Sequence, residues 1–308
     1  MNQKKTILVT GATGAQGGSV AKALLHEKKF NVRILTRNAH SPKAQALLRA
    51  GAEIAEGDMD DLQSLKKAMG GVYGVFGVTS FWEHYEKEFR HGKNLVTAVH
   101  QSGIKHFIFS TLANYHQLSG EKYFVAHFDL KAELEEYTRS LKIPATFMRI
   151  AFYYENFLNF SPLQKDENGD LFFGFPQGDT RLSIVSAEDM GGVVAPVFDH
   201  PREYVGRVVG VVGEDLPCDE YAAIFSQVLQ RKVYYKHIPR DVYAGLGFPG
   251  AEELANMFEV QRLYIKERQL DLIESYGLNP SMQRFKTWLE RNKEKFESHI
   301  AAQIRAAV

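Results

Sequence analysis

Residues Thr6 to Gly17 read TILVTGATGAQG, and this short stretch decides the fold. Its first part, Thr6–Val9, is an apolar and β-branched run of the kind that forms a buried strand. Its second part has a glycine at every third position, and the helical pattern Gln16–Glu27 follows at once. Glycines at such a turn allow a pyrophosphate to approach closely, and the free amides and dipole of the helix then bind it. The stretch predicts a dinucleotide-binding turn made of Gly11, Ala12, Thr13, Gly14, Ala15, Gln16 and Gly17.

The first half of the chain continues this alternation of strand and helix. Further strand-like apolar runs lie at Val32–Thr36, Ala52–Ala55, Val72–Val78, His106–Ser110 and Thr146–Ile150. Helical patterns separate them at Lys43–Ala50, Leu62–Met69, Lys87–Ser102 and Asp129–Leu141. Because the strands are apolar along their length, we expect helices on both faces of a parallel sheet. The prediction is an α/β fold of the Rossmann-type, doubly wound class.

The second half predicts a smaller α/β lobe that packs on the first without a flexible linker. We expect residues 1–150 to form the dinucleotide-binding domain and residues 151–308 to form the lobe. Ser161–Thr180 is expected to be rich in loops, because it contains several glycines and prolines. The elements predicted after it are a strand at Arg207–Val212, a helix at Asp219–Leu229, a strand at Val233–His237, and helices at Ala251–Lys266 and Ser281–Phe296.

The end of the second strand predicts which dinucleotide is bound. Domains that select NAD(H) carry an acid about 20 residues past the last glycine, where it binds the ribose 2′-hydroxyl. This chain has Thr36-Arg37-Asn38 at that point. A guanidinium pairs with a 2′-phosphate, whereas an acid would repel it. Arg37 therefore indicates NADP(H); the alternative is a solvated arginine at the end of a strand.

Two more loops follow predicted strands at the sheet edge where such folds bind ligands. Asp58 and Met59 follow the third strand and are expected to contact the adenine. Asp58 has an alternative role as the cap of the next helix. Thr79, Ser80 and Phe81 follow the fourth strand and are expected near the nicotinamide. These loops extend the predicted cofactor site along the sheet.

The helix after the fifth strand lacks a tyrosine that short-chain dehydrogenase/reductases normally use. They carry Tyr-x-x-x-Lys there, a spacing that puts both side chains on one helix face. Here the segment reads AHFDLK, so Lys131 is present and His127 replaces the tyrosine. In an active enzyme Lys131 would grip the ribose and His127 could relay a proton. Alternatively, His127 packs on the cofactor or caps the helix.

The segment after the sixth strand is dense in aromatic residues. Its position predicts contacts beside the nicotinamide, although the same residues would suit the core of the lobe equally well. The residues concerned are Tyr153, Tyr154, Glu155 and Asn156.

Composition excludes several classes of partner. The 37 Lys and Arg residues balance 37 Asp and Glu residues, so no basic field exists to hold nucleic acid or an anionic membrane. Cys218 is the only cysteine, and the histidines follow no metal-ligand spacing, so neither a disulfide nor a metal site is expected.

The first apolar run is too short for a signal peptide, and no apolar run reaches the ~18 residues of a membrane span. We expect a soluble, cytoplasmic protein, also nuclear if the source is eukaryotic.

Taken together, these segments resemble the NmrA-like family of atypical short-chain dehydrogenase/reductases. The similarity runs through GATGAQGGSVAKALL, ILTRN, GDMDD, AHFDLK, YYENFL, GFPGAEELANMF and FKTWLE, and it covers nearly the whole chain. The resemblance implies NADP(H) binding by the residues named above and little or no dehydrogenase activity. It also implies a redox sensor that reads the NADPH/NADP ratio and regulates protein partners, transcription factors among them. The partner surface would lie around Ala151–Ala187, and the protein would shift between dimer and monomer.

Two other functions are open on the residues alone. An NADPH-dependent reductase of a quinone, an enal or an imine requires that donor and acceptor be well positioned. Lys131 or His127 would then be its proton source. A nucleotide-sugar epimerase of the extended short-chain type has a similar length but needs the missing tyrosine, so it ranks last.

Overall fold

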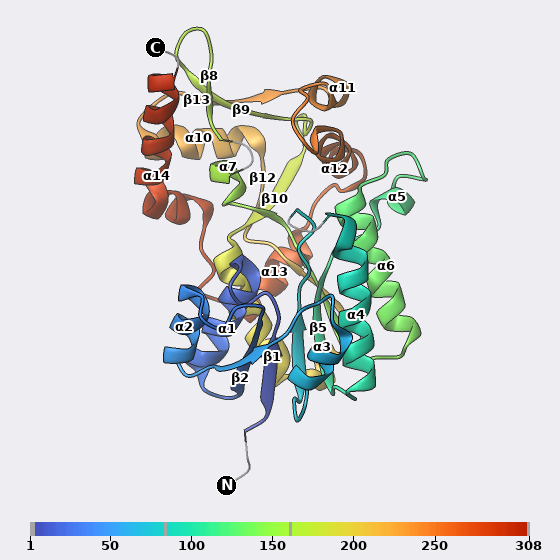
Figure 1. Ribbon diagram of the computed structural model, residues 1–308. Coiled ribbons are helices and arrows are strands. Elements are labelled where there is room, and N and C mark those ends of the chain that lie inside the picture. Colours follow the sequence, from blue (N-terminus) through green and yellow to red (C-terminus); the bar gives the residue numbers. More distant parts are fainter. Residues whose placement is uncertain (1–3, 83–84, 160–161, 307–308) are drawn as a thin grey trace.

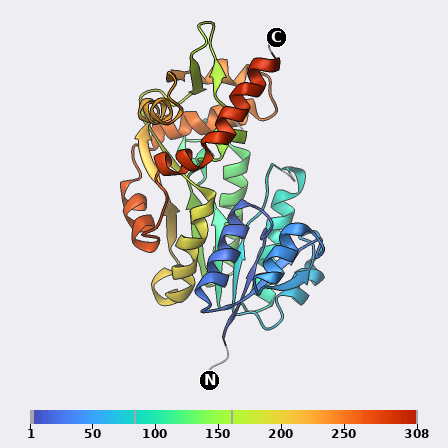
Figure 2. The ribbon, with the colours of Figure 1, turned by 90° about the vertical axis from the view of Figure 1, so that its left-hand side faces the viewer.

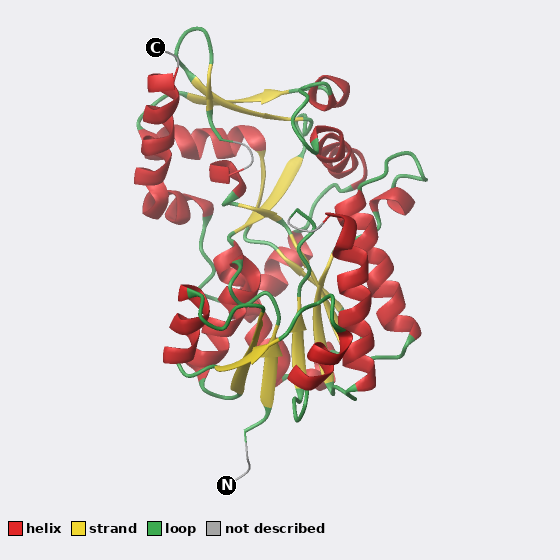
Figure 3. Cartoon of the chain, viewed as in Figure 1, coloured by secondary structure: helices red, strands yellow, loops and turns green. Residues whose placement is uncertain are grey.

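The computed structural model describes residues 4–82, 85–159 and 162–306. The half that contains the amino terminus is a helix-flanked sheet, and a second lobe is stacked on the carboxyl ends of its strands (Figure 1). Figure 3 shows the strands of the first half side by side with helices in front of and behind them. Within the described residues, no helix combines the length and the apolar character needed to cross a lipid bilayer.

Seven parallel strands form the central sheet in the order β11-β6-β5-β4-β1-β2-β3. They are β1 (Thr6–Val9), β2 (Asn31–Thr36), β3 (Glu53–Glu56), β4 (Gly74–Gly77), β5 (His106–Thr111), β6 (Ala145–Ile150) and β11 (Val208–Val211). The direction in which successive strands are added reverses beside β1. Ligands of doubly wound folds bind in the crevice outside the strand ends at this reversal.

Helices cover both faces of the sheet, which is why its strands are apolar throughout. On one face lie α1 (Ala15–Glu27), α2 (Pro42–Arg49), α8 (Met190–Asp199) and α13 (Gln269–Leu278). On the other lie α3 (Leu62–Ala68), α4 (Glu88–Gln101) and α6 (Ala126–Ser140). Every residue of β4 and β5 is buried between these layers.

Helix α6 begins a turn earlier than the predicted start at Asp129. The Asp129 carboxylate accepts hydrogen bonds from the backbone N–H of Val125 at 2.7 Å and of Tyr115 at 2.7 Å. It therefore ties the first turn of α6 to the residue that precedes the helix, and it also holds the start of α5 (Tyr115–Leu118). The earlier start places His127 on the helix.

The lobe consists of two small sheets, β12-β10-β7 and β13-β9-β8, and several helices. Its strands are β7 (Phe152–Tyr153), β8 (Gln164–Lys165), β9 (Leu171–Phe175), β10 (Arg181–Val185), β12 (Glu214–Pro217) and β13 (Val233–His237). Its helices are α7 (Asn156–Asn159), α10 (Cys218–Leu229), α11 (Arg240–Ala244), α12 (Ala251–Tyr264) and α14 (Phe285–Ala306); α9 (Pro201–Tyr204) precedes β11. Figure 2 shows α14 lying across the outside of the lobe. A buried aromatic cluster that includes Phe157, Phe225 and Phe285 holds these elements together.

The fold class is confirmed, and the central sheet also contains a strand from beyond residue 150. After building part of the lobe, the chain returns to the sheet, where β11 pairs with β6 and α8 and α13 cover one face. The apolar run Arg207–Val212 predicted β11 but not its place in the central sheet, and α8 and α13 were not predicted. Ser161–Thr180 also contains β8 and β9 rather than loop alone.

Candidate functional site

A long cleft of about 1220 Å³ crosses the carboxyl ends of the central strands and continues beneath the lobe. Loops after β1 through β6 line it from below, and residues of β7 and α12 line it from the lobe. Small-molecule pockets typically measure ~300–1,000 Å³. The cleft is therefore large enough for more than one ligand.

The glycine-rich loop after β1 is shaped for an anion. Gly11 has a φ of +60°, and Gly14 precedes α1 without a side-chain cap or an acid in the first turn. A Cβ at Gly17 would lie 2.4 Å from the carbonyl oxygens of Gly11 and Thr10, so the helix reaches this loop only with glycine there. The amides and the positive end of the helix dipole remain available. This arrangement fits a pyrophosphate.

Two cationic side chains lie at the adenosine end of the cleft. Arg37 follows β2 as predicted, and Lys43 from α2 lines the same wall. Lys43 Nζ donates to the carbonyl oxygen of Thr13 at 3.0 Å, which ties α2 to the glycine-rich loop. Cations in this position suit a ribose 2′-phosphate.

Asp58 and Met59 also line the cleft, but Asp58 does not cap the next helix. Asp61 makes that cap by accepting from the backbone N–H of Gln63 at 2.9 Å. Asp58 Oδ1 instead accepts from the backbone N–H of Asp60 at 2.9 Å and so shapes the turn. The turn presents Asp58 and Met59 to the place where an adenine would lie.

A group of Asp58, Asp60 and His91 has ligand-type atoms within 4.8 Å of one another. The Asp60 carboxylate, however, is surrounded by basic side chains: Lys87 Nζ at 3.1 Å, Arg90 at 2.5 Å and His91 Nε2 at 3.1 Å. The hydrogen bond from Lys87 is the main cause that lowers the pKa of Asp60 far below its usual value. These contacts describe an ion-pair cluster rather than a metal site.

Thr79, Ser80 and Phe81 line the next part of the cleft, together with Lys131. Lys131 Nζ donates to Thr79 Oγ1 at 2.7 Å and to Glu88 Oε1 at 2.5 Å. Thr79 also donates to the same carboxylate at 2.7 Å. Glu88 is fully buried, so this network fixes the ammonium group at the cleft wall.

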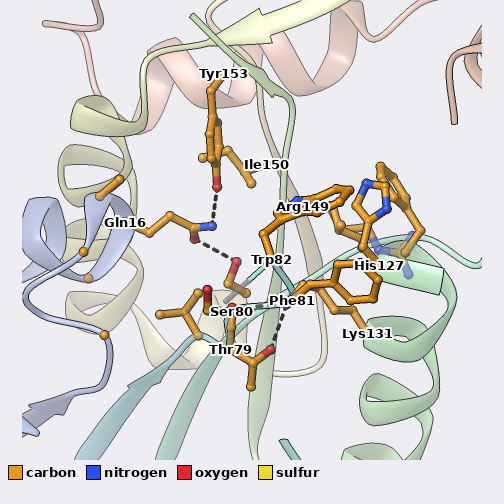
Figure 4. A pocket seen from close by; sticks show the side chains of 18 of the residues that line it. Gln16, Thr79, Ser80, Phe81, Trp82, His127, Lys131, Arg149, Ile150 and Tyr153 are labelled. Carbon is orange, nitrogen blue, oxygen red and sulfur yellow. Dashed lines mark hydrogen bonds between the residues drawn. The ribbon is translucent and has the colours of Figure 1, made fainter. Parts of the chain in front are cut away.

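His127 lies one helical turn from Lys131, where the tyrosine of the short-chain motif would be. Its Nδ1 is 2.5 Å from Oε1 of Glu253 on α12, and the same oxygen accepts from the His127 backbone N–H at 2.7 Å. The imidazole ring faces Phe81 and Trp82 with centroid distances of 5.6 and 5.3 Å (Figure 4). His127 therefore does not cap α6; Glu253 caps it and orients the ring.

Gln16 bridges the cleft between the two halves of the molecule. Its Nε2 donates to the Tyr153 hydroxyl at 2.5 Å, and its Oε1 accepts from the Ser110 hydroxyl at 2.8 Å (Figure 4). Burial raises the pKa of Tyr153 to about 12, so the phenol stays protonated at neutral pH. Gln16 and Tyr153, both predicted site residues, thus meet at one point together with Ser110.

Some predicted site residues do not reach the cleft. Ala12 is buried in the sheet half, and Tyr154 donates its hydroxyl proton to the carbonyl of Gln283 at 3.1 Å inside the lobe. Glu155 accepts from the Ser186 hydroxyl at 2.8 Å. Tyr153 and Asn156, which are three residues apart, line the cleft, whereas the two residues between them make contacts elsewhere. The alternative of core aromatic residues therefore holds for Tyr154 but not for Tyr153.

Part of the segment Ala151–Ala187, where the family resemblance implies a partner surface, lies in the core of the lobe. Large apolar side chains such as Phe157, Phe175 and Ile184 are fully buried there. These buried side chains belong to the same core as those of α10 and α14.

Beyond Lys131 and Tyr153 the cleft opens into what we call the aromatic compartment. Its side chains are Phe81, Trp82, Tyr115, His127, Phe128, Phe152, Leu254, Met257 and Phe258. The rings of Tyr115 and Phe128 stack at 4.0 Å. Glu88, Glu253 and the α12 residues were not among the predicted site residues, because no local sequence pattern shows that they join this site.

Comparisons with solved structures show the same fold. NmrA, a negative transcriptional regulator crystallised with NADP, superposes with a TM-score of 0.81 at 23% identity over 98% of both chains. The NADPH-dependent quinone oxidoreductase QOR2 of Escherichia coli, crystallised with NADPH, gives a TM-score of 0.77 at 22% identity, covering 92% of this chain and 99% of that one.

Sequence comparisons identify the family. The NmrA-like family oxidoreductase FrzB of Cladobotryum sp is 32% identical over 276 residues, which are 82% of each chain. An NmrA-like family protein of Dictyostelium discoideum is 31% identical over 76% of this chain and 80% of its own length. The model of the NmrA-like family matches residues 3–295. The chain therefore belongs to the NmrA-like family.

Proposed function

We propose that this protein is an NADPH-dependent reductase of a flat, conjugated acceptor such as a quinone, an enal or an imine. The observation that carries the proposal is the aromatic compartment, which continues the cleft past Lys131 and Tyr153. Offset or edge-on contacts with aromatic rings favour a planar ligand. A protein that bound only the dinucleotide would have no need of this space.

Several features support NADP(H) as the cofactor. The glycine-rich loop fits a pyrophosphate, and Arg37 and Lys43 suit a 2′-phosphate. Two proteins of the same fold were crystallised with NADP or NADPH, and relatives such as FrzB are named oxidoreductases. When bound, NADPH supplies a hydride.

The residues of the chain would position the reactants and exclude water. Lys131, fixed by Thr79 and Glu88, lies where it can hold the nicotinamide ribose. The rings of the aromatic compartment, Phe128 and Tyr115 among them, would press the acceptor against the nicotinamide face. Such positioning can supply a large part of a rate acceleration.

The test follows NADPH oxidation spectroscopically with a panel of quinones, enals and imines. We expect saturable turnover with at least one class. Met257→Trp fills the aromatic compartment from α12, so the KM for the acceptor should rise while the Kd for NADPH stays unchanged. Val242→Trp, on the exposed surface of α11, is the matched control. Tight NADPH binding without oxidation across the panel would contradict the proposal.

A second candidate is the regulatory role that the family resemblance implies, in which cofactor occupancy changes association with another protein or with a second copy. The hydrogen bond between Gln16 and Tyr153 favours it, because it joins the phosphate-binding loop directly to the lobe. NADPH should then slow hydrogen exchange in β7 and α7, and Gln16→Ala should remove this effect. Exchange that is the same with and without NADPH would argue against coupling.

A further inference from the structure

Glu253 and His127 come from opposite halves of the molecule and meet at the aromatic compartment. Glu253 lies in the first turn of α12, and His127 lies in the first turn of α6. One carboxylate oxygen, Oε1, is 2.7 Å from the His127 backbone nitrogen and 2.5 Å from Nδ1 of its ring. The two contacts fix both the start of the helix and the direction of the imidazole.

The pair is enclosed, unlike an ordinary surface ion pair. The side chains of His127 and Glu253 are 10% and 16% exposed, and Phe81 and Trp82 lie against the ring. The adjacent residue Glu252 is 76% exposed and faces outward to Arg240 at 3.2 Å. Two neighbouring acids on α12 thus have different surroundings, and of the two only Glu253 contacts His127, which lines the cleft.

The contact to Nδ1 leaves Nε2 as the nitrogen available to a ligand. No hydrogen bond to Nε2 is found among the residues that the structure describes, and His127 lines the cleft. A carboxylate on Nδ1 sets the tautomer of the ring. The nearest other cation along α6, Lys131, is neutralised by Glu88.

We propose that His127 is the proton donor of this site and that Glu253 is its positioning residue. This inference rests on the proposed reductase function. In the step, the acceptor gains an electron pair with the hydride from NADPH. The Nε2–H bond of protonated His127 breaks, an O–H or N–H bond forms on the acceptor, and the neutral ring takes a proton back from water. The site is therefore complete only when α12 of the lobe packs on α6.

The kinetic test compares Glu253→Gln, Glu253→Asp and the matched control Glu252→Gln. General acid catalysis contributes ~10²–10⁴-fold to a rate, so His127→Phe should lower kcat by about this factor. Glu253→Gln should lower kcat by about tenfold or more without changing the KM for NADPH, since Gln keeps the hydrogen bond and removes the charge. Glu253→Asp should recover part of the loss, and Glu252→Gln should match the wild type.

His127→Tyr supplies a sharper comparison, because it restores the Tyr-x-x-x-Lys spacing with Lys131. A phenol at this position has no need of a carboxylate on a ring nitrogen. We expect His127→Tyr to be more active than His127→Phe, and the addition of Glu253→Gln to have little further effect on it. If Glu253→Gln lowers kcat by the same factor in the wild type and in His127→Tyr, the positioning role of Glu253 is overturned.

The second readout does not depend on turnover. Nitrogen-15 NMR of labelled histidine in the full chain should show neutral His127 protonated on Nδ1. In Glu253→Ala the ring should shift to the Nε2-protonated form, and Glu252→Ala should leave it unchanged.

Wild-type turnover that survives in His127→Phe and Glu253→Gln would overturn this inference and leave the reductase function intact. A wild type that never oxidises NADPH would contradict the reductase function and the donor role, and the NMR would still report whether Glu253 orients the ring.

Discussion

At the scale of single residues, charges near the cleft decide which cofactor can bind. Arg37 stands at the end of β2, where an acid would favour NAD(H), and Lys43 joins it from α2. Lys43 is already hydrogen-bonded to the glycine-rich loop, so Arg37 is the side chain left to meet a 2′-phosphate.

Arg37→Ala should weaken NADPH binding and leave NADH binding almost unchanged. A charge-assisted contact contributes ~1.5–3 kcal/mol, which corresponds to about 10–150-fold in Kd. Isothermal titration with both nucleotides measures the difference, and Arg49→Ala at the end of α2 is the control. A similar loss for both nucleotides would mean that Arg37 does not contact the phosphate.

The buried imidazole of His106 should make the stability of the fold sensitive to acid. It is fully buried beside Thr146, and burial lowers its pKa from 6.5 to about 4. Between these values the unfolded chain binds a proton that the folded protein does not, so stability falls as the pH falls from about 6.5 to about 4, by up to ~3 kcal/mol. His106→Phe removes this titration. Its stability relative to the wild type should improve as the pH falls, as urea unfolding at several pH values would show; an unchanged difference would contradict the assignment.

At the scale of elements, the junction of β1 and α1 is a part of the fold that does not tolerate an added side chain. The helix starts directly over the loop, and the missing side chain of Gly17 makes that approach possible. Gly277 in α13 has open space around it instead.

Gly17→Ala should destabilise the protein by several kcal/mol and abolish NADPH binding, because its Cβ would lie 2.4 Å from two carbonyl oxygens. Gly277→Ala should be neutral or stabilising by up to ~1 kcal/mol, since alanine has the higher helix propensity. Denaturant unfolding of both variants tests the pair. Equal stabilities would show that the helix can move away from the loop.

The elements that could be predicted from sequence are those with local signals. Apolar runs between helical patterns gave β1 to β6 within a few residues, and the glycine spacing gave the loop. Glu253 could not be found in this way, because its partner His127 lies 126 residues earlier and only tertiary packing joins them. Tyr153 and Tyr154 could not be told apart, because they are neighbours in sequence and only tertiary packing shows that Tyr154 bonds to Gln283 inside the lobe while Tyr153 lines the cleft.

At the scale of the whole molecule, the two halves are interwoven rather than consecutive. β11 completes the sheet beyond β6, and α8 packs closely on α1, with Gly191 against the carbonyl of Ser19. The aromatic compartment lies between the sheet half and α12, so the site also needs both halves.

A fragment of residues 1–150 should therefore fail to fold cooperatively. It would leave β6 as an unpaired edge and expose the apolar face that α8 and α13 cover. Circular dichroism during urea unfolding and NADPH titration of the fragment are the measurements. A sharp unfolding transition with intact NADPH binding would show that the first six strands are self-sufficient.

Transfer of deuterium from NADPH to an acceptor is the most direct test of the central claim. The purified protein is incubated with NADPH that carries deuterium at the transferable position and with an acceptor from the panel, and the product is analysed by mass spectrometry. We expect one deuterium in the reduced product, and less of this product at a limiting acceptor concentration when Met257→Trp fills the aromatic compartment. Saturable NADPH binding with no deuterium in any product would contradict the reductase and leave the regulatory role as the better explanation.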